Sequence, residues 1–227
     1  MNSAQHQRKH AGRGKDFIVL PLVFVLLTAA AVYLALSPVV KPYLGLARVF
    51  FSQNSRNAPT DRFTGLSEGL ATSGEVTVDE KPVTGDLIGR IDIEEAGISV
   101  PLYYGDNSAQ LNQGAGLYPG AWLPGQERTV LAAGHTGTFF RGLGDVQPGM
   151  EIRVTTYYGE YVYEVTGTAV HEATDDTSYD FSRTDENLIL YTCYPFDSLG
   201  YTPFRFFVYA DYVSGPALTI AQQGGTS

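Results

Sequence analysis

Hydrophobic and polar positions divide the chain into an apolar N-terminal segment, a polar spacer and a region of short apolar runs. Residues 1–16 are polar and basic, and residues 17–36 then form a run of 20 positions without a charged side chain. A helix of that length measures about 30 Å, which matches the hydrocarbon core of a bilayer. We therefore expect a basic tail at 1–16 and a transmembrane anchor at 17–36.

The orientation follows from where the cations lie. They precede the apolar segment, so the positive-inside rule predicts a single-pass protein of the cell membrane with a cytoplasmic N-terminus and an extracytoplasmic remainder. A cleaved signal peptide is the alternative, because residues 29–31 are small alanines. The apolar run continues to Leu36, however, and exceeds the roughly 7–15 residues of a signal-peptide core. The pattern favours an uncleaved anchor.

Residues 37–80 are expected to form an extracytoplasmic stalk or linker. From about residue 52 the composition shifts to Ser, Asn, Thr, Gly and Glu with few large apolar side chains. Such a segment buries too little surface to offset the entropy of ordering it. The folded domain is accordingly placed at 81–213, and residues 214–227 are interpreted as a C-terminal tail.

Within the domain, short apolar or alternating runs are separated by Gly, Pro and Asp turns. The runs predict strands at 87–93, 98–104, 129–133, 150–156, 160–170, 187–192 and 204–213. Residues 107–113 suit one short helix capped by Asn107 or Ser108, and residues 157–160 suit a hairpin turn. This pattern is typical of a mainly β fold, an antiparallel barrel or sandwich.

One thiol marks a candidate site. Cys193 is the only cysteine of the 227 residues, follows the apolar run 188–192 and is closely followed by Pro195, so it belongs at the rim of a sheet. A single cysteine also excludes an intramolecular disulfide. Because a free thiol has a pKa near ~8.5, a nucleophilic Cys193 needs a base or a charge partner.

Two further residues stand at the edges of predicted strands, His135 after 129–133 and Arg205 at the start of 204–213. Among the four histidines, His6 and His10 lie on the cytoplasmic side of the predicted anchor. His135 has a glycine directly before it and another two positions after it, which allow a tight turn and an exposed ring. His171 ends a predicted strand among acidic residues and is expected to be an ordinary solvated strand end.

Each residue also has an ordinary structural interpretation. A lone cysteine is more often a small buried hydrophobe, a lone histidine is usually just hydrogen-bonded, and a lone arginine is usually ion-paired. The coincidence of all three at strand edges of one domain favours a Cys/His/Arg enzyme.

Charge limits the partners. The chain has a net charge of −9, but residues 1–48 hold six basic and one acidic side chain, so the remainder, with 9 basic and 23 acidic groups, has a net charge of −14. A domain this acidic repels phosphate, which argues against nucleic acid. Asp175, Asp176, Asp180 and Asp185 lack the ligand spacing of a calcium loop, so no metal or cofactor is expected.

The residues around Cys193 resemble the sortase family. Residues 189–193, Ile-Leu-Tyr-Thr-Cys, resemble the sortase Thr-Leu-x-Thr-Cys motif, with Ile189 in place of the first threonine. The continuation through Arg205 to Ala210 and the segment 131–141 around His135 resemble class D sortases in particular. The resemblance spans roughly residues 86–212 and agrees with an N-terminal anchor followed by a stalk.

This resemblance implies a closed eight-stranded β-barrel and a membrane-anchored cysteine transpeptidase. Cys193 would be the nucleophile that attacks the Thr–Gly bond of a Leu-Pro-x-Thr-Gly-like sorting signal on a surface protein or pilin. His135 would be the general acid and base, and Arg205 would stabilise the oxyanion or position the substrate. The acyl group would pass to an amine of a peptidoglycan precursor or a pilin lysine.

Several alternatives stay open at the level of sequence. One is a thiol hydrolase of the same fold in which water resolves the acyl enzyme, and another is a non-enzymatic anchored β-domain for binding. The residues do not choose between wall anchoring and pilus assembly. They also leave open whether Cys193 and His135 react as a neutral pair or as an ion pair, because their titrations are coupled.

Overall fold

The computed structural model describes residues 25–28, 60–64, 69–198, 200 and 202–221. The chain divides into two units, residues 1–40 and 41–227, and of the first only the short helical stretch 25–28 is described. Among the described residues, no helix has the length and apolar character needed to cross a membrane. The predicted cytoplasmic tail 1–16 and most of the predicted anchor 17–36 lie outside the described residues.

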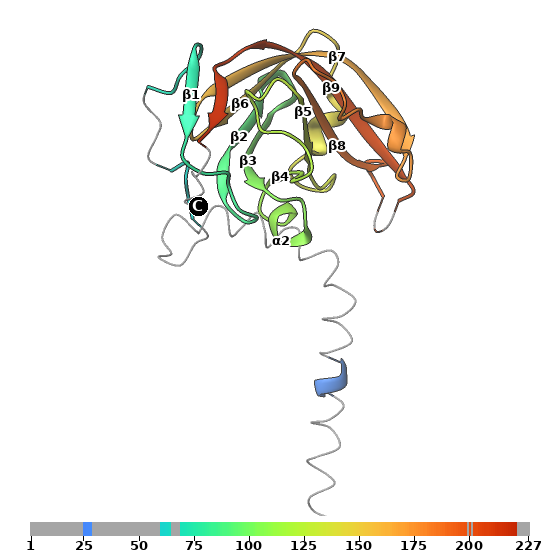
Figure 1. The fold of residues 1–227 in the computed structure, drawn as a ribbon. Coiled ribbons are helices and arrows are strands. Elements are labelled where there is room, and N and C mark those ends of the chain that lie inside the picture. Colours follow the sequence, from blue (N-terminus) through green and yellow to red (C-terminus); the bar gives the residue numbers. More distant parts are fainter. Residues whose placement is uncertain (1–24, 29–59, 65–68, 199, 201, 222–227) are drawn as a thin grey trace, which may run out of the picture. The chain divides into compact units, whose positions relative to one another are not determined.

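The second unit is built on a closed barrel of eight strands in the order β2-β3-β4-β5-β8-β9-β7-β6 (Figure 1). The strands are β2 (Leu87–Ile93), β3 (Ile98–Tyr104), β4 (Ala115–Leu117), β5 (Thr129–Ala133), β6 (Glu151–Thr156), β7 (Glu160–Glu172), β8 (Asn187–Tyr194) and β9 (Phe204–Ser214). The prediction of a mainly β fold with a closed eight-stranded barrel is confirmed.

The expectation of an antiparallel barrel or sandwich is wrong for two pairs of strands. β3 pairs with β4 in parallel, and β5 pairs with β8 in parallel. The sequence pattern missed β4, whose three residues are too few to show alternation. The pairing of β5 with β8 matters most, because parallel neighbours end at the same edge of a sheet.

Short helices connect the strands. The expected helix is α2 (Ser108–Leu111), and its cap is Asn107, whose side chain accepts a hydrogen bond from the backbone of Ala109 at 3.0 Å. The described part of the chain also has three 3₁₀ turns, η2 (Glu94–Ala96), η3 (Arg141–Asp145) and η4 (Asp176–Ser178). The predicted hairpin turn lies where expected, between β6 and β7.

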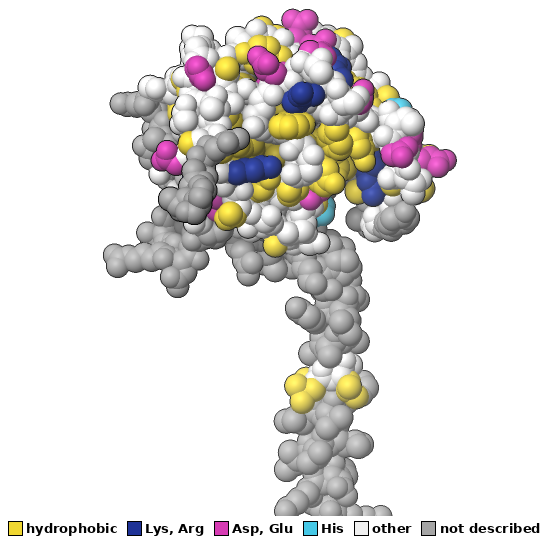
Figure 2. Space-filling view, viewed as in Figure 1, with side chains coloured by type: hydrophobic (Ala, Val, Ile, Leu, Met, Phe, Trp, Pro, Cys, Tyr) yellow, Lys and Arg dark blue, Asp and Glu magenta, His cyan; other side chains and the backbone are white. Residues whose placement is uncertain are grey.

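Apolar side chains cover both faces of the central strands. On β8, Leu188 and Leu190 point into the barrel core, whereas Ile189 packs with Leu131 and Phe207 in a second cluster on the outer face. Such alternation places successive side chains on opposite sides of the sheet. Hydrophobic side chains accordingly gather over β5 and β8 on the outer surface of the barrel (Figure 2).

Ordered structure extends beyond both predicted domain boundaries. β1 (Glu75–Val78), within the predicted stalk, pairs in parallel with β10 (Ala217–Ile220), within the predicted tail. Both strands thus lie outside the predicted limits of 81–213. Each strand has only four residues, so neither gives a strong local signal, and their order comes from pairing and from burial of Val78 and Leu218 against the barrel.

Candidate active site

Cys193 lies on β8 one residue before the strand ends, on the outer face of the barrel. Its side chain is partly buried and is a free thiol. Ile189, Tyr191 and Cys193 alternate with core-facing residues, so the three share one face. The thiol is thus at the rim of the sheet, as the sequence predicts, and it lies beside the apolar outer surface.

His135 is brought next to Cys193 by the parallel pairing of β5 with β8. Ala133 lies opposite Tyr191 in this register. His135 lies two residues beyond Ala133, past the end of β5, and Cys193 lies two residues beyond Tyr191 on β8. The ladder continues to Gly134, whose backbone N–H donates to the carbonyl oxygen of Tyr191 at 3.2 Å, so His135 and Cys193 come to the same edge of the sheet. The residue directly before His135 must be a glycine, because a Cβ on Gly134 would lie 2.6 Å from the ring of Phe140. The later glycine, Gly137, has open space around it and meets no such restriction.

Two threonine hydroxyls, which the sequence analysis did not single out, fasten the turn of His135 to the strand of Cys193. Thr136 Oγ1 donates to the carbonyl oxygen of Cys193 at 2.7 Å, and Thr192 Oγ1 donates to the carbonyl oxygen of Gly134 at 2.7 Å. The two hydroxyl oxygens are 2.8 Å apart and buried. These bonds hold the backbone that carries His135 next to the backbone that carries Cys193.

Arg205 lies on the other side of the thiol. β9 runs antiparallel to β8, and Arg205 is directly opposite Cys193. Its Nη1 donates to the carbonyl oxygens of Thr202 and Phe204, both at 2.8 Å. These bonds hold the guanidinium against the loop before β9. The strand order β5-β8-β9 and this register therefore place His135, Cys193 and Arg205 in one row, with Cys193 in the middle.

The electrostatic environment favours a neutral imidazole. Burial lowers the pKa of His135, since desolvation penalises its charged form. At neutral pH the ring can accept a proton from the thiol and later return it to another group. The guanidinium of Arg205 can donate hydrogen bonds to an oxygen that gains negative charge. The arrangement is suited to nucleophilic attack by sulfur on a carbonyl group.

His171 is not the solvated strand end that the sequence suggested. Its Nδ1 is 2.9 Å from Asp175 Oδ2, and its Nε2 is 3.3 Å from the hydroxyl of Tyr209. The ring also packs edge-on against Phe207, with centroids 5.5 Å apart. Although His171 lies opposite Arg205 on β7, its contacts tie the loop between β7 and β8 to β9.

The acidic residues of this loop serve its local structure. Asp175 accepts from the backbone and hydroxyl of Thr177, and Asp180 accepts from the backbone and hydroxyl of Ser182. These bonds lower the pKa of both carboxyl groups. The carboxylates thus stabilise turns by the usual side-chain to backbone bonds.

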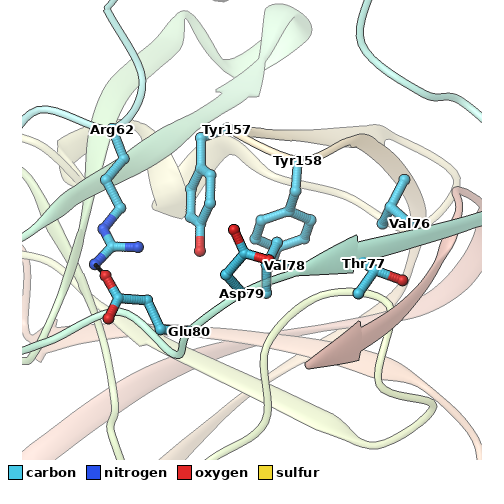
Figure 3. A pocket seen from close by; sticks show the side chains of 8 residues that line it. All are labelled: Arg62, Val76, Thr77, Val78, Asp79, Glu80, Tyr157 and Tyr158. Carbon is cyan, nitrogen blue, oxygen red and sulfur yellow. Dashed lines mark hydrogen bonds and ion pairs between the residues drawn. The ribbon is translucent and has the colours of Figure 1, made fainter. Parts of the chain in front are cut away.

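A separate pocket of about 540 Å³ lies away from this row (Figure 3). It is bounded by β1 and by the turn between β6 and β7, where Arg62 bridges Asp86 and Glu80 and lies over the ring of Tyr157. These contacts attach residues 61–64 to the barrel. None of the three predicted site residues lines this pocket.

Fold and site together define the class: a closed β-barrel with a thiol on its outer rim between an imidazole and a guanidinium. The family model described as the Sortase domain matches residues 91–213. Sortase D of Bacillus subtilis (strain 168) is 31% identical over 134 residues, which cover 59% of this chain and 68% of that protein. The chain belongs to the sortase family, and it is most like class D.

Solved structures agree on the fold. A Sortase D5 transpeptidase of Clostridium perfringens has a TM-score of 0.53 and 24% identity, covering 59% of this chain and 82% of that one. The SrtA sortase from Actinomyces oris has a TM-score of 0.54 and 26% identity, covering 61% and 86%. Together with the family match, these similarities make the chain a sortase-family transpeptidase.

Proposed function

We propose that this chain is a membrane-anchored cysteine transpeptidase that cleaves a Leu-Pro-x-Thr-Gly-like sorting signal between Thr and Gly and transfers the acyl group to an amine. The observation that supports this most strongly is the row formed just past the end of β5 and on β8 and β9. His135, Cys193 and Arg205 come from segments up to 70 residues apart in the sequence, yet they occupy adjacent positions at one edge.

In the first half-reaction, the sulfur of Cys193 attacks the carbonyl carbon of the signal threonine while His135 takes the thiol proton. The imidazolium then gives that proton to the nitrogen of the departing glycine, so the C–N bond breaks as a neutral amine leaves. The product is a thioester between the threonine and Cys193. The lowered pKa of His135 suits this sequence, because the ring begins and ends the step neutral.

In the second half-reaction, an amine attacks the thioester carbonyl and His135 removes a proton from the attacking nitrogen. The C–S bond breaks, a new amide forms and the proton returns to the sulfur. The acceptor is an amine of a cell-wall precursor or of a pilin lysine. One imidazole thus serves both halves of a ping-pong reaction.

Arg205 stabilises the carbonyl oxygen as it gains negative charge, or holds the backbone of the signal. Its bonds within the described residues all use Nη1. The Nε and Nη2 donors are therefore available to a substrate, and a planar guanidinium can offer them together. The anchor predicted at 17–36 would keep this site outside the cell membrane, where surface proteins and wall precursors meet.

The test is to incubate the purified full-length chain with a library of Leu-Pro-x-Thr-Gly peptides, with and without amines such as glycine oligomers and lysine derivatives. We expect ligated products whose yield depends on the amine. Cleavage at the same rate without any amine would instead identify a thiol hydrolase. Binding of peptide without cleavage would identify a non-enzymatic domain.

A further inference from the structure

One transverse row of the sheet lies immediately behind the row of Cys193. In this row Gly116 of β4 is opposite Ala133 of β5, which is opposite Tyr191 of β8, which is opposite Phe207 of β9. Directly opposed residues point to the same face of a sheet. Two small residues, Gly116 and Ala133, therefore form a low floor beside the ring of Tyr191.

The segment that follows β3 lies over the low end of this floor. Gly105 donates its backbone N–H to the carbonyl oxygen of Leu117 at 2.8 Å. A Cβ at Gly116 would be only 2.9 Å from the Cα of Asp106. Because residue 116 is a glycine, the backbone of Asp106 can lie close to the sheet at the other end of this row from Tyr191.

The carboxyl group of Asp106 is partly buried and has little hydrogen bonding. Within the described part of the chain, the donor that lowers its pKa is its own backbone N–H, whereas burial raises the pKa overall. No side chain among the described residues donates to it. A carboxylate in such a place has unused acceptor capacity, which a donor on a bound molecule can satisfy.

Tyr191 and Asp106 lie over the same face of this row, on either side of Ala133. Burial, and next the negative charge of Asp106, raise the pKa of Tyr191 to about 12, while the charge of Arg205 acts in the opposite direction. The Tyr191 ring stacks on Phe207 with centroids 5.5 Å apart and is held in place. A donor side chain on this floor therefore has two oxygen acceptors near it.

The position of the row relative to Cys193 indicates which part of a substrate it meets. The apolar outer face extends back along β8 and the strand ends just beyond Cys193, so a signal acylated on Cys193 would extend its acyl portion back over this face. One row back is two residues, or about 6.6 Å of extended chain. That distance is within reach of the two residues that precede the signal threonine, which are proline and x.

Proline has no side-chain donor, so x is the residue whose identity this floor can read. We propose that Asp106 and Tyr191 form a polar subsite that selects a cationic, hydrogen-bond-donating side chain at position x of the sorting signal. This inference rests on the proposed transpeptidase function. Tyr191 occupies position x of the Thr-Leu-x-Thr-Cys motif, and in this proposal it contacts residue x of the sorting signal.

The test compares kcat/KM for four peptides with Lys, Gln, Ala or Glu at x, using the full-length chain. We expect wild type to favour Lys over Glu by about tenfold, since opposite charges in a partly buried site attract. Asp106→Lys should reverse this order, and the nearly isosteric Asp106→Asn should abolish the charge preference. Tyr191→Phe should keep the preference for Lys and reduce discrimination between Gln and Ala.

Glu164→Lys is the matched control, because Glu164 is an exposed carboxylate near the opposite end of β7 and its reversal changes the net charge equally. It should leave the order of the four peptides unchanged. An unchanged order in both Asp106 variants, or a wild type indifferent to x, would overturn the subsite while leaving the transpeptidase intact. A wild type that processes none of the peptides with any amine would overturn both.

Discussion

The two ends of β8 differ in how completely their polar groups are satisfied. Just before the strand, the carboxylate of Glu186 is buried and accepts from the backbone N–H groups of Gly125 and Glu127, each at 3.0 Å, and from the hydroxyl of Tyr163 at 2.6 Å. Near the other end, the backbone around Cys193 is fastened, but the thiol is only partly buried.

Along this single strand, the end next to Glu186 stabilises the fold and the end at Cys193 carries the reactive group. Burial raises the pKa of Glu186, and its three donors counteract that shift, so the group is fixed and used by the fold. At the rim, the backbone is fixed by Thr136 and Thr192 while the reactive atoms keep capacity for a substrate. We expect changes at the first end to alter stability and changes at the second end to alter activity.

The largest effect is expected from Cys193→Ala. Removing the nucleophile should lower kcat/KM for ligation by on the order of 10⁴-fold or more, because no thioester can form. The midpoint of thermal unfolding should stay close to that of wild type, since the side chain is small and partly exposed. Normal turnover by this variant would refute the mechanism.

Arg205→Lys comes next. A lysine retains the charge but cannot offer the planar set of donors, so we expect kcat/KM to fall by about 10²-fold. Steady-state kinetics of peptide ligation measures this. Rates near those of wild type would limit Arg205 to bulk electrostatics.

Glu186→Ala tests the other end of β8. Two buried donors and one partly buried donor would lose their acceptor, and we expect the free energy of unfolding to drop by about 1–3 kcal/mol. Urea denaturation measures the loss, and kcat at a temperature where the variant is folded should match wild type. A large fall in kcat with unchanged stability would reverse the assignment of the two ends.

The pH dependence of kcat/KM probes His135. Its pKa is lowered by burial, so the neutral, competent ring persists as the pH falls past the ordinary histidine value of about 6.5. Activity should be retained at that pH and lost only as the pH drops through the lowered pKa. An acid limb centred above about 6.5 would point to a stabilised imidazolium and so to an ion pair with the thiol.

The smallest effect is expected from His171→Ala. Its contacts with Asp175 and Tyr209 are partly exposed, and losing them should cost about 1 kcal/mol, seen as a few-fold rise in KM through a looser loop between β7 and β8. Asp175→Asn should act in the same direction. A loss of kcat comparable to that of Cys193→Ala would instead make His171 the base.

The sequence predicts those strands whose own residues show a hydrophobic pattern. β2, β3 and β5 to β9 each contain an apolar or alternating run bounded by turn residues, and the cysteine motif marks the end of β8. It misses β1, β4 and β10, which have three or four residues each and are ordered only by partners far along the chain. Local patterns reveal such strands poorly because pairing, not propensity, determines them.

The three candidate residues could be named from the sequence, but not what positions them. Thr136 and Thr192 meet across 56 residues, and Asp106 reaches the floor beside Tyr191 because Gly116 leaves room. Both arrangements depend on the parallel pairings of β3 with β4 and of β5 with β8. A prediction that assumes antiparallel neighbours cannot bring these residues together.

The most direct measurement is the intact mass of the full-length chain after brief exposure to a Leu-Pro-x-Thr-Gly peptide, followed by addition of an amine. The account predicts a mass increase equal to the acyl fragment, located on Cys193 by fragmentation, absent in Cys193→Ala and removed by the amine as ligated peptide appears. Ligated peptide formed without any adduct on Cys193, or formed equally by Cys193→Ala, would contradict it.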